Sequence, residues 1–434
     1  MRLPLMYKAR QKMPRPKLDN VEQKVRAELV RGRFWAKLKP GARIAVTAGS
    51  RGISNIDLIL RTVISVLQEK GAQPFLVAAM GSHGGGTAQG QLDILKSLGI
   101  TETAMGAPVL ATTEAREVGC LQEGLPAYQN KLALESDGII VVNRVKPHTS
   151  FRGEVESGLM KMMVVGLGNA AGATAIHNLG TKGLRENLLP MGRLLVQRTP
   201  VLFGLGIVEN GYEETAWIEG LEPEQFAQGE GRLLQEAKRL VSRIPFDQLD
   251  ILVVEEMGKV FSGTGMDTNV IGRLRIQGQS EPETPQIKRI VVLDLAHESH
   301  GNANGIGLAD FTTRRLVEKI DYQATYTNVL AATFVQRAMI PMFFPTARES
   351  LGAALKSLGL NSAASPGLSS PGLSSPGLSS RDSLRMVRIK NTLCLDELFI
   401  SQGLLAEAGN NPHLEVIEDG HPFGFDGDRP TPDW

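Results

Sequence analysis

In the first part of the chain, continuous apolar runs take turns with a segment whose apolar residues recur at helical spacing. Residues 43–48 (RIAVTA) form a β-rich apolar run, and apolar residues then recur at helical spacing from Ile56 to Leu67. A second apolar run follows at 74–79 (PFLVAA). A strand, a helix and a strand in so short a stretch predict a βαβ unit, and hence a parallel sheet that binds ligands beyond the carboxyl ends of its strands.

Local signals predict where this helix begins and ends. Ser54, followed three residues later by Asp57, predicts a capping pair at the start of the helix. Gly71 predicts its end, because glycine adopts the left-handed conformation that commonly follows a helix.

Polar loops follow each apolar run. The first run is followed by Gly49-Ser50-Arg51-Gly52, and the second by the glycine-rich segment 81–87 (GSHGGGT). A third apolar run at 138–142 (GIIVV) leads into residues 143–148 (NRVKPH). Since parallel strands end at the same edge of a sheet, we expect Arg51, His83 and His148 to converge there.

The second half of the chain repeats the α/β pattern. We predict an N-terminal domain over 1–245 and a C-terminal domain over 246–434, and therefore an α/β fold of two domains. The N-terminal domain is expected to hold a mainly parallel sheet, with the active site in the cleft between the domains. Further predicted elements are a basic helix over 231–243, strands over 250–256 and 289–295, and a helix over 311–320. The SPGLS repeats within 362–380 predict a disordered insertion, because Pro, Gly and Ser at that density do not pack a core.

Composition adds little chemistry of its own. The formal net charge is +1, so no global field attracts nucleic acid or an anionic membrane. Cys120 and Cys394 lack metal-binding spacing, and we expect both to be buried as small apolar residues. The N-terminus lacks the apolar core of a signal peptide and no apolar run reaches spanning length, which predicts a cytoplasmic protein without a membrane partner.

Few side chains can carry acid–base chemistry, because the chain has 7 histidines in all. His83 lies among glycines, His148 follows Pro147, and His177 lies in an Ala/Gly-rich segment that could be helical. The glycine-rich loop around Gly84 and Gly85 has two interpretations: a turn into a helix at Thr87, or a backbone nest that binds an anion.

Lys161 stands in a run of Leu, Met, Val and Gly residues from 158 to 166. Lysine is rarely buried without a partner or a reaction. It is therefore either a side chain whose stem packs while its amine reaches water, or a desolvated amine with a lowered pKa.

The ordered set of these motifs resembles the lactate racemase family, the nickel-pincer-nucleotide racemases and epimerases of 2-hydroxy acids. The resemblance rests on Pro147-His148, on Lys161, and on Gly166 and His177 at 5 and 16 residues beyond that lysine. Upstream, Gly81-Ser82-His83 and Ser50-Arg51 match the family's strand-end motifs. The resemblance spans roughly residues 45–180.

The resemblance implies an isomerase with a nickel-pincer nucleotide, a pyridinium mononucleotide whose two thiocarbonyl arms hold nickel. Lys161 would be its covalent tether and His177 the nickel ligand, with Ser50, Arg51, Gly84 and Gly85 completing the cofactor site. Imidazole is a reasonable donor for Ni(II) in a tetragonal site. The implied partners are a 2-hydroxy acid and the proteins that make the cofactor.

His83 and His148 would then be paired general bases on opposite sides of the substrate carbon. One imidazole takes the hydroxyl proton while the α-hydrogen leaves as hydride, and its return to the other face of the 2-keto acid inverts the centre. Arg51 would hold the cofactor phosphate or the substrate carboxylate.

Two departures from the family pattern suggest a substrate other than lactate. Ala48 stands where the family carries an Asp, and the span from His148 to Lys161 is a few residues longer. Arg152 in that longer span could contact a second anionic group of the substrate, or could be a surface residue paired with Glu154 or Glu156.

Lys259, in the C-terminal half, is a candidate substrate contact. Together with the loops 262–269 and 297–302 it could close over the substrate, although these segments could equally be surface loops. Two other functions stay open: a metal-dependent hydrolase with His83, His148 and His177 as direct ligands, and a non-catalytic protein that binds a nucleotide or an anion.

Overall fold

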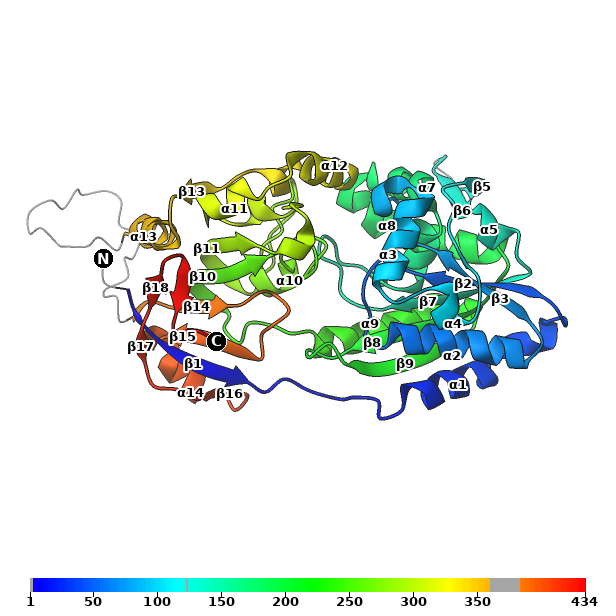
Figure 1. Ribbon diagram of the computed structural model, residues 1–434, viewed down its shortest axis with the longest axis horizontal. Coiled ribbons are helices and arrows are strands. Elements are labelled where there is room, and N and C mark those ends of the chain that lie inside the picture. Colours follow the sequence, from blue (N-terminus) through cyan, green and yellow to red (C-terminus); the bar gives the residue numbers. More distant parts are fainter. Residues whose placement is uncertain (1–2, 122–123, 360–382) are drawn as a thin grey trace, which may run out of the picture. The chain divides into compact units, whose positions relative to one another are not determined.

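A computed structural model describes residues 3–121, 124–359 and 383–434. The chain forms two compact units, one over Pro14–Val241 and the other combining Met1–Met13 with Ser242–Trp434 (Figure 1). The sequence placed residues 1–13 in the first domain, but strand β1 (Leu5–Gln11) pairs with β15 (Glu397–Ser401) in the second unit. The segment 362–380, predicted to be disordered, lies outside the described residues.

The Pro14–Val241 unit is built on a sheet in the order β4-β3-β2-β7-β8-β9. All neighbours pair in parallel except β8 and β9, which are antiparallel. The strands are β2 (Arg43–Ala48), β3 (Gln73–Ala78), β4 (Val109–Leu110), β7 (Gly138–Arg144), β8 (Val201–Glu209) and β9 (Thr215–Leu221), with a separate antiparallel pair β5 (Ala115–Cys120) and β6 (Pro126–Asn130).

Helices cover both faces of this sheet (Figure 1). Alternate residues of each strand enter different cores: Ile44 and Val46 pack with the first helices, whereas Ala45 packs with the later ones. The helices are α1 (Val21–Arg31), α2 (Ile56–Glu69), α3 (Ala88–Ser97), α4 (Glu102–Met105), α5 (Lys131–Leu134), α6 (Leu159–Lys161), α7 (Asn169–His177), α8 (Gly180–Arg198) and α9 (Phe226–Leu240), with a π-helical turn over Met162–Gly166 and 3₁₀ turns over Arg33–Lys37, Gly84–Gly86 and Pro223–Gln225.

The second unit contains a larger mixed sheet in the order β13-β12-β11-β10-β14-β15-β1-β16, with β17 also paired to β1. Its β10 to β14 part is parallel, and its β15 and β1 part is antiparallel. The remaining strands are β10 (Gln248–Met257), β11 (Gln286–Leu295), β12 (Phe311–Thr313), β13 (Met342–Phe344), β14 (Met386–Ile389), β16 (Leu414–Val416) and β17 (His421–Pro422), with a separate hairpin of β18 (Gly424–Asp426) and β19 (Arg429–Thr431). The helices are α10 (Thr268–Ile271), α11 (Arg314–Glu318), α12 (Tyr322–Ala332), α13 (Ala347–Ser357) and α14 (Leu405–Gly409), and 3₁₀ turns lie over His297–Ser299, Ile306–Leu308, Val335–Ala338 and Gln402–Leu404.

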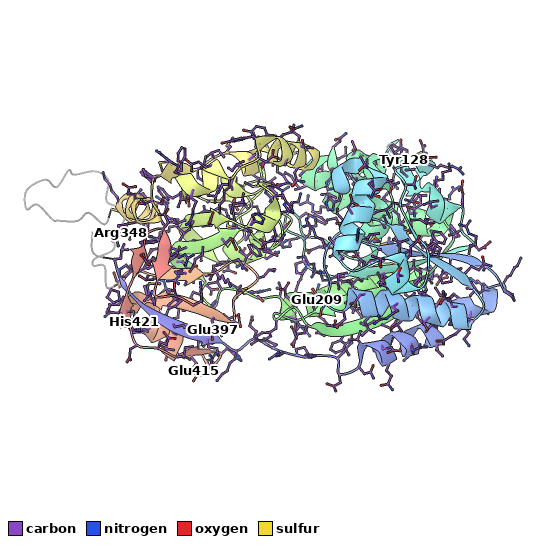
Figure 2. The ribbon with its side chains drawn as sticks, in the orientation of Figure 1. Tyr128, Glu209, Arg348, Glu397, Glu415 and His421 are labelled. Atoms are coloured by element: carbon purple, nitrogen blue, oxygen red, sulfur yellow. The ribbon has the colours of Figure 1, made fainter. Side chains whose placement is uncertain are left out.

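Charged side chains reinforce this sheet on either side of β1. Lys8 and Arg10 pair with Glu397 of β15, and Lys12 pairs with Glu415 of β16. Figure 2 labels these two glutamates. Together with the backbone ladder, these contacts explain why the N-terminal strand belongs to the second unit.

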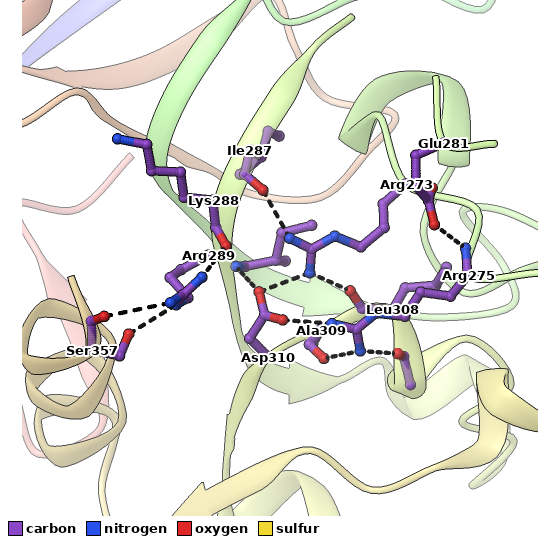
Figure 3. A network of polar contacts seen from close by, with 12 residues as sticks. Arg273, Arg275, Glu281, Ile287, Lys288, Arg289, Leu308, Ala309, Asp310 and Ser357 are labelled. Atoms are coloured by element: carbon purple, nitrogen blue, oxygen red, sulfur yellow. Dashed lines mark hydrogen bonds and ion pairs between the residues drawn. The ribbon is translucent and has the colours of Figure 1, made fainter. Parts of the chain in front are cut away.

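A network formed by the partly buried side chains of Arg273 and Arg275 orders the loops beside β11. Arg273 and Arg275 contact the two carboxylate oxygens of Asp310 at 2.7 and 2.5 Å, and Arg275 also donates to the carbonyl oxygen of Ala309 at 2.9 Å (Figure 3). The backbone N–H of Arg275 donates to Glu281 at 2.8 Å. Each member has a protein partner, and we interpret the network as structural.

The predicted α/β class is confirmed, with parallel strands dominating the first sheet. The predicted strand over 43–48 matches β2, and Gly71 follows the last turn of α2 with a φ of +79°. The predicted cap at Ser54 is wrong, because Asn55 is the N-cap of α2 and the Ser54 backbone N–H donates to Glu209.

Two further sequence predictions need correction. The helix predicted over 311–320 begins as strand β12, and only Arg314–Glu318 is helical. Cys120 and Cys394 are exposed, not buried.

No single helix of the described residues is both long and apolar enough to cross a membrane. One pair, Leu159–Gly166 with Asn169–His177, passes by length and composition only when joined, and it is bent by 106°.

Candidate active site

The predicted convergence of three strand ends is present. Strand β2 lies between β3 and β7 and is parallel to both, so their carboxyl ends lie at one edge of the sheet. This edge carries Ser50 and Arg51 after β2, His83 after β3, and His148 after β7.

The His83 loop is a tight glycine turn that contacts the loop after β2. Ser50 Oγ lies 2.5 Å from His83 Nδ1, which fixes the orientation of the ring. Gly84 and Gly85 have φ values of +68° and +65°, a region that side chains with a Cβ rarely adopt. At Gly84 a Cβ would also meet the backbone nitrogen of Gln91 at 2.5 Å. The predicted helix start is confirmed as well, because the Thr87 side chain accepts from the Gly90 N–H at 3.1 Å and caps α3.

Lys161 lies where α6 passes into the π-helical turn Met162–Gly166. Turns of this kind often occur at functional sites. The Gly81 N–H donates to the Gly166 carbonyl oxygen at 3.1 Å, which joins the His83 loop to the turn after Lys161. At Gly166 a Cβ would lie 2.8 Å from the carbonyl oxygen of Ala79, so only glycine lets the turn after Lys161 pack this closely against the end of β3.

His148 and Lys161 form a direct pair. The Ser150 N–H donates to His148 Nδ1 at 3.0 Å, so that nitrogen carries a lone pair. In a neutral imidazole the proton is then on Nε2, which lies 2.6 Å from Lys161 Nζ. Only an unprotonated amine can accept this hydrogen bond. The geometry therefore matches a neutral lysine.

Burial is the main reason that the amine loses its proton readily. Burial, together with the nearby charges of Arg51 and Lys146, lowers the pKa of Lys161 from 10.5 to about 8. Of the two interpretations of Lys161 from the sequence, these observations favour the desolvated amine.

His177 lies at the end of α7 and keeps a buried nitrogen. Its Nδ1 is buried and has no hydrogen-bond partner. Burial, and secondarily the charge of Lys161, lowers the pKa of His177 to about 4, so the ring is neutral at ordinary pH. A neutral imidazole with an unused buried nitrogen is the form that binds a metal ion.

Positive charge is concentrated around the strand ends. Burial, with the charge of Arg144, lowers the pKa of Arg51. Arg144 forms an ion pair with Glu209. The positive charges of Arg51 and Lys146 lie close enough to Lys161 to lower its pKa. Such a group of cations favours an anionic ligand.

Arg152 occupies a different position from these residues. Its side chain is 47% exposed, and its guanidinium donates to the carbonyl oxygens of His148 and Phe151 at 2.6 and 3.1 Å. It also lies 3.9 Å from Glu156. These contacts favour a role in shaping the loop over a contact with substrate.

Lys259 belongs to the second unit. Its Nζ donates to Asn328 Oδ1, and its backbone N–H donates to Ser299 Oγ at 2.8 Å. Its suggested contact with substrate stays a prediction.

Two buried glutamates lie beside the site; from the sequence, Glu156 was named only as a possible partner of Arg152, and Glu230 was not named. Glu156 accepts from the His148 N–H at 2.7 Å, and Glu230 accepts from the Met160 N–H at 2.8 Å. Glu230 had a detectable signal, because it lies on the apolar stripe of α9 with Phe226, Leu233, Leu234 and Ala237.

The alternative with three histidines as direct metal ligands is not supported. It needs the imidazoles of His83, His148 and His177 around one ion, and residues 3–121, 124–359 and 383–434 contain no group of three or more His, Cys, Asp or Glu side chains arranged in that way.

Comparison with known proteins finds similarity at the level of the fold. The sequence matches no family model and no curated protein. Among solved structures, the chain is similar to the lactate racemase apoprotein from Thermoanaerobacterium thermosaccharolyticum, with a TM-score of 0.49, 14% identity, and coverage of 80% of this chain and 89% of that one. A likeness at this level establishes neither family nor activity.

Proposed function

We propose that this chain is an isomerase, a racemase or epimerase of a 2-hydroxy acid that uses a nickel-pincer nucleotide. The observation that carries the proposal is the part-buried contact of 2.6 Å between Lys161 Nζ and His148 Nε2, because an amine with a lowered pKa is more readily unprotonated and is then a nucleophile available for covalent attachment. The ordered motifs of the sequence support the same assignment.

The residues present fit such a cofactor. Lys161 supplies the amine for the tether, and the unpartnered Nδ1 of His177 supplies a buried nitrogen donor for nickel. The cations Arg51 and Lys146, with the glycine loop at Gly84, favour the phosphate of a nucleotide. The chemistry supplied by the bound cofactor is reversible acceptance of the α-hydrogen as hydride.

The chain's own residues supply proton transfer and orientation. His83, oriented by Ser50, would accept the hydroxyl proton from one enantiomer, and His148 from the other. His148 Nε2 carries the proton of the neutral ring and contacts Lys161, so its use as a base requires that contact to open and the proton to leave Nε2. Arg51 would hold the substrate carboxylate or the cofactor phosphate.

The decisive experiment is intact mass spectrometry after co-expression with the genes that make the cofactor. Wild-type protein is expected to gain several hundred daltons (roughly the mass of a nucleotide) together with nickel, and Lys161→Ala is expected to lose the adduct. Lys182→Ala, which removes a surface lysine, is the matched control and should keep it.

The other two functions predict different outcomes of this experiment. A hydrolase would gain metal without covalent mass, and a non-catalytic binding protein would gain neither. Either result with the co-expressed wild-type protein refutes the proposal.

A further inference from the structure

Helix α9 contacts both halves of the His148–Lys161 pair. Glu230, near its start, points toward the first turn of α6, which carries Lys161. Lys238, two turns later, pairs with Glu156 at 2.8 Å. One rigid helix therefore supports two segments that are separate in the sequence.

The first support is a buried carboxylate at the start of α6. Glu230 Oε2 accepts from the Met160 N–H at 2.8 Å, and the Leu159 N–H also contacts this carboxylate. These are amides that a short helix leaves without partners. At Gly158 a Cβ would come within 2.4 Å of the carboxylate, so the glycine makes room for it.

The second support holds the loop that carries His148. Glu156 is 0% exposed, and its Oε2 accepts from the His148 N–H at 2.7 Å. The loop is closed by a backbone bridge between Lys146 and Ser157, with hydrogen bonds of 2.9 and 3.2 Å. Lys238 of α9 forms the shorter ion pair with Glu156, at 2.8 Å, compared with 3.9 Å for Arg152.

Burying two carboxylates is costly, and burial raises the pKa of Glu230 to about 7. Both side chains bind backbone N–H groups within one residue of the pair, Met160 beside Lys161 and His148 itself. A small movement of either backbone would change a contact of 2.6 Å between Nε2 and Nζ.

We propose that α9 sets the distance between His148 Nε2 and Lys161 Nζ, with Glu230 and Glu156 as positioning residues. The proposal rests on the function suggested above, in which these two side chains react. Through these contacts α9 keeps Lys161 desolvated and in contact with the imidazole.

The test measures the proton affinity of Lys161 in the full chain without cofactor. The protein is acetylated briefly with acetic anhydride across a pH series, and mass spectrometry of peptides gives the midpoint for Lys161, with exposed Lys182 as internal reference. The variants are Glu230→Met, Glu230→Gln and Lys238→Met. Glu236→Met is the control, since Glu236 lies on the same helix and pairs with Arg239 at the surface.

Wild-type Lys161 should give a midpoint near 8, and Glu236→Met should match it. Glu230→Met should raise the midpoint by about half a pH unit or more, because loosening the turn admits water to the amine. Glu230→Gln should restore it, since the amide oxygen still accepts from Met160. Lys238→Met should give a smaller rise through Glu156.

Unchanged midpoints in folded Glu230→Met and Lys238→Met would overturn the proposal. If Glu230→Met does not fold, Lys238→Met decides, because Lys238 is partly exposed and its loss leaves the core intact. Shifted midpoints in a chain that gains no adduct on co-expression would refute the proposed cofactor and leave the positioning role in place.

Discussion

Replacing Lys161 by Met should stabilise the chain at neutral pH, which is the reverse of the usual result for a buried residue. The pKa of Lys161 falls from 10.5 to about 8 on folding. Because the folded state binds the proton less tightly than the unfolded state, the charged amine destabilises the fold below pH 8. Stability then rises as pH increases through the interval from 8 to 10.5.

The magnitude follows from these two values. At pH 7 the amine is mostly protonated in the folded and the unfolded chain, and its lowered pKa destabilises the fold by about 3 kcal/mol. At pH 9.5 the amine is mostly protonated only in the unfolded chain, and the destabilisation is about half as large. The neutral amine at pH 9.5 also accepts the hydrogen bond from His148, whose loss in the variant offsets about 1 kcal/mol. Lys161→Met is therefore expected to stabilise the Pro14–Val241 unit by about 3 kcal/mol at pH 7 and by close to nothing at pH 9.5.

The assay is urea unfolding followed by tryptophan fluorescence at both pH values. A Trp434→Phe background leaves Trp35 and Trp217, which both report on the Pro14–Val241 unit. Lys182→Met, at an exposed position of α8, is the control and should change little at either pH. A pH-independent loss of stability in Lys161→Met would refute the reasoning, because it would mean that the amine is not desolvated.

Two further predictions concern packing. Gly158→Ala should destabilise the Pro14–Val241 unit by about 1–3 kcal/mol, because the new Cβ would lie 2.4 Å from the enclosed Glu230 carboxylate. The control is Gly231→Ala, whose new Cβ would have its nearest neighbour at 3.5 Å. Equal melting temperatures of the two variants would contradict the prediction. Arg388→Leu should destabilise the second unit by about 2–4 kcal/mol, because the buried Arg388 lies 2.5 Å from Glu255 and its loss removes the charge that pairs with that carboxylate. The measurement is unfolding followed by the fluorescence of the adjacent Trp434, and an unchanged unfolding midpoint would contradict the prediction.

Much of the fold was already encoded in local patterns of the sequence. The apolar runs at 43–48 and 138–142 became strands β2 and β7, because a continuous apolar run between turn residues is typical of a buried parallel strand. The order of the strand-end motifs then located Ser50, Arg51, His83 and His148 at one edge of the sheet. Parallel pairing makes that convergence necessary once the strands are known.

Other features depended on contacts between distant residues. The cap of α2 was predicted incorrectly because Glu209, far along the chain, binds the Ser54 N–H. The place of β1 was missed for the same reason, since its partners β15 and β16 lie near the opposite end of the sequence. Local propensity carries no information on such pairs.

The sequence by itself determined which side chains could react, because few histidines exist and Lys161 stands in an apolar segment. Only the tertiary structure decided the state of that lysine. Its desolvation comes from packing, and its neutral form follows from a chain of hydrogen bonds through His148 to the Ser150 backbone. The supporting role of Glu156 and Glu230 was likewise decided by the tertiary structure, because a carboxylate becomes a support only when folding buries it against backbone N–H groups.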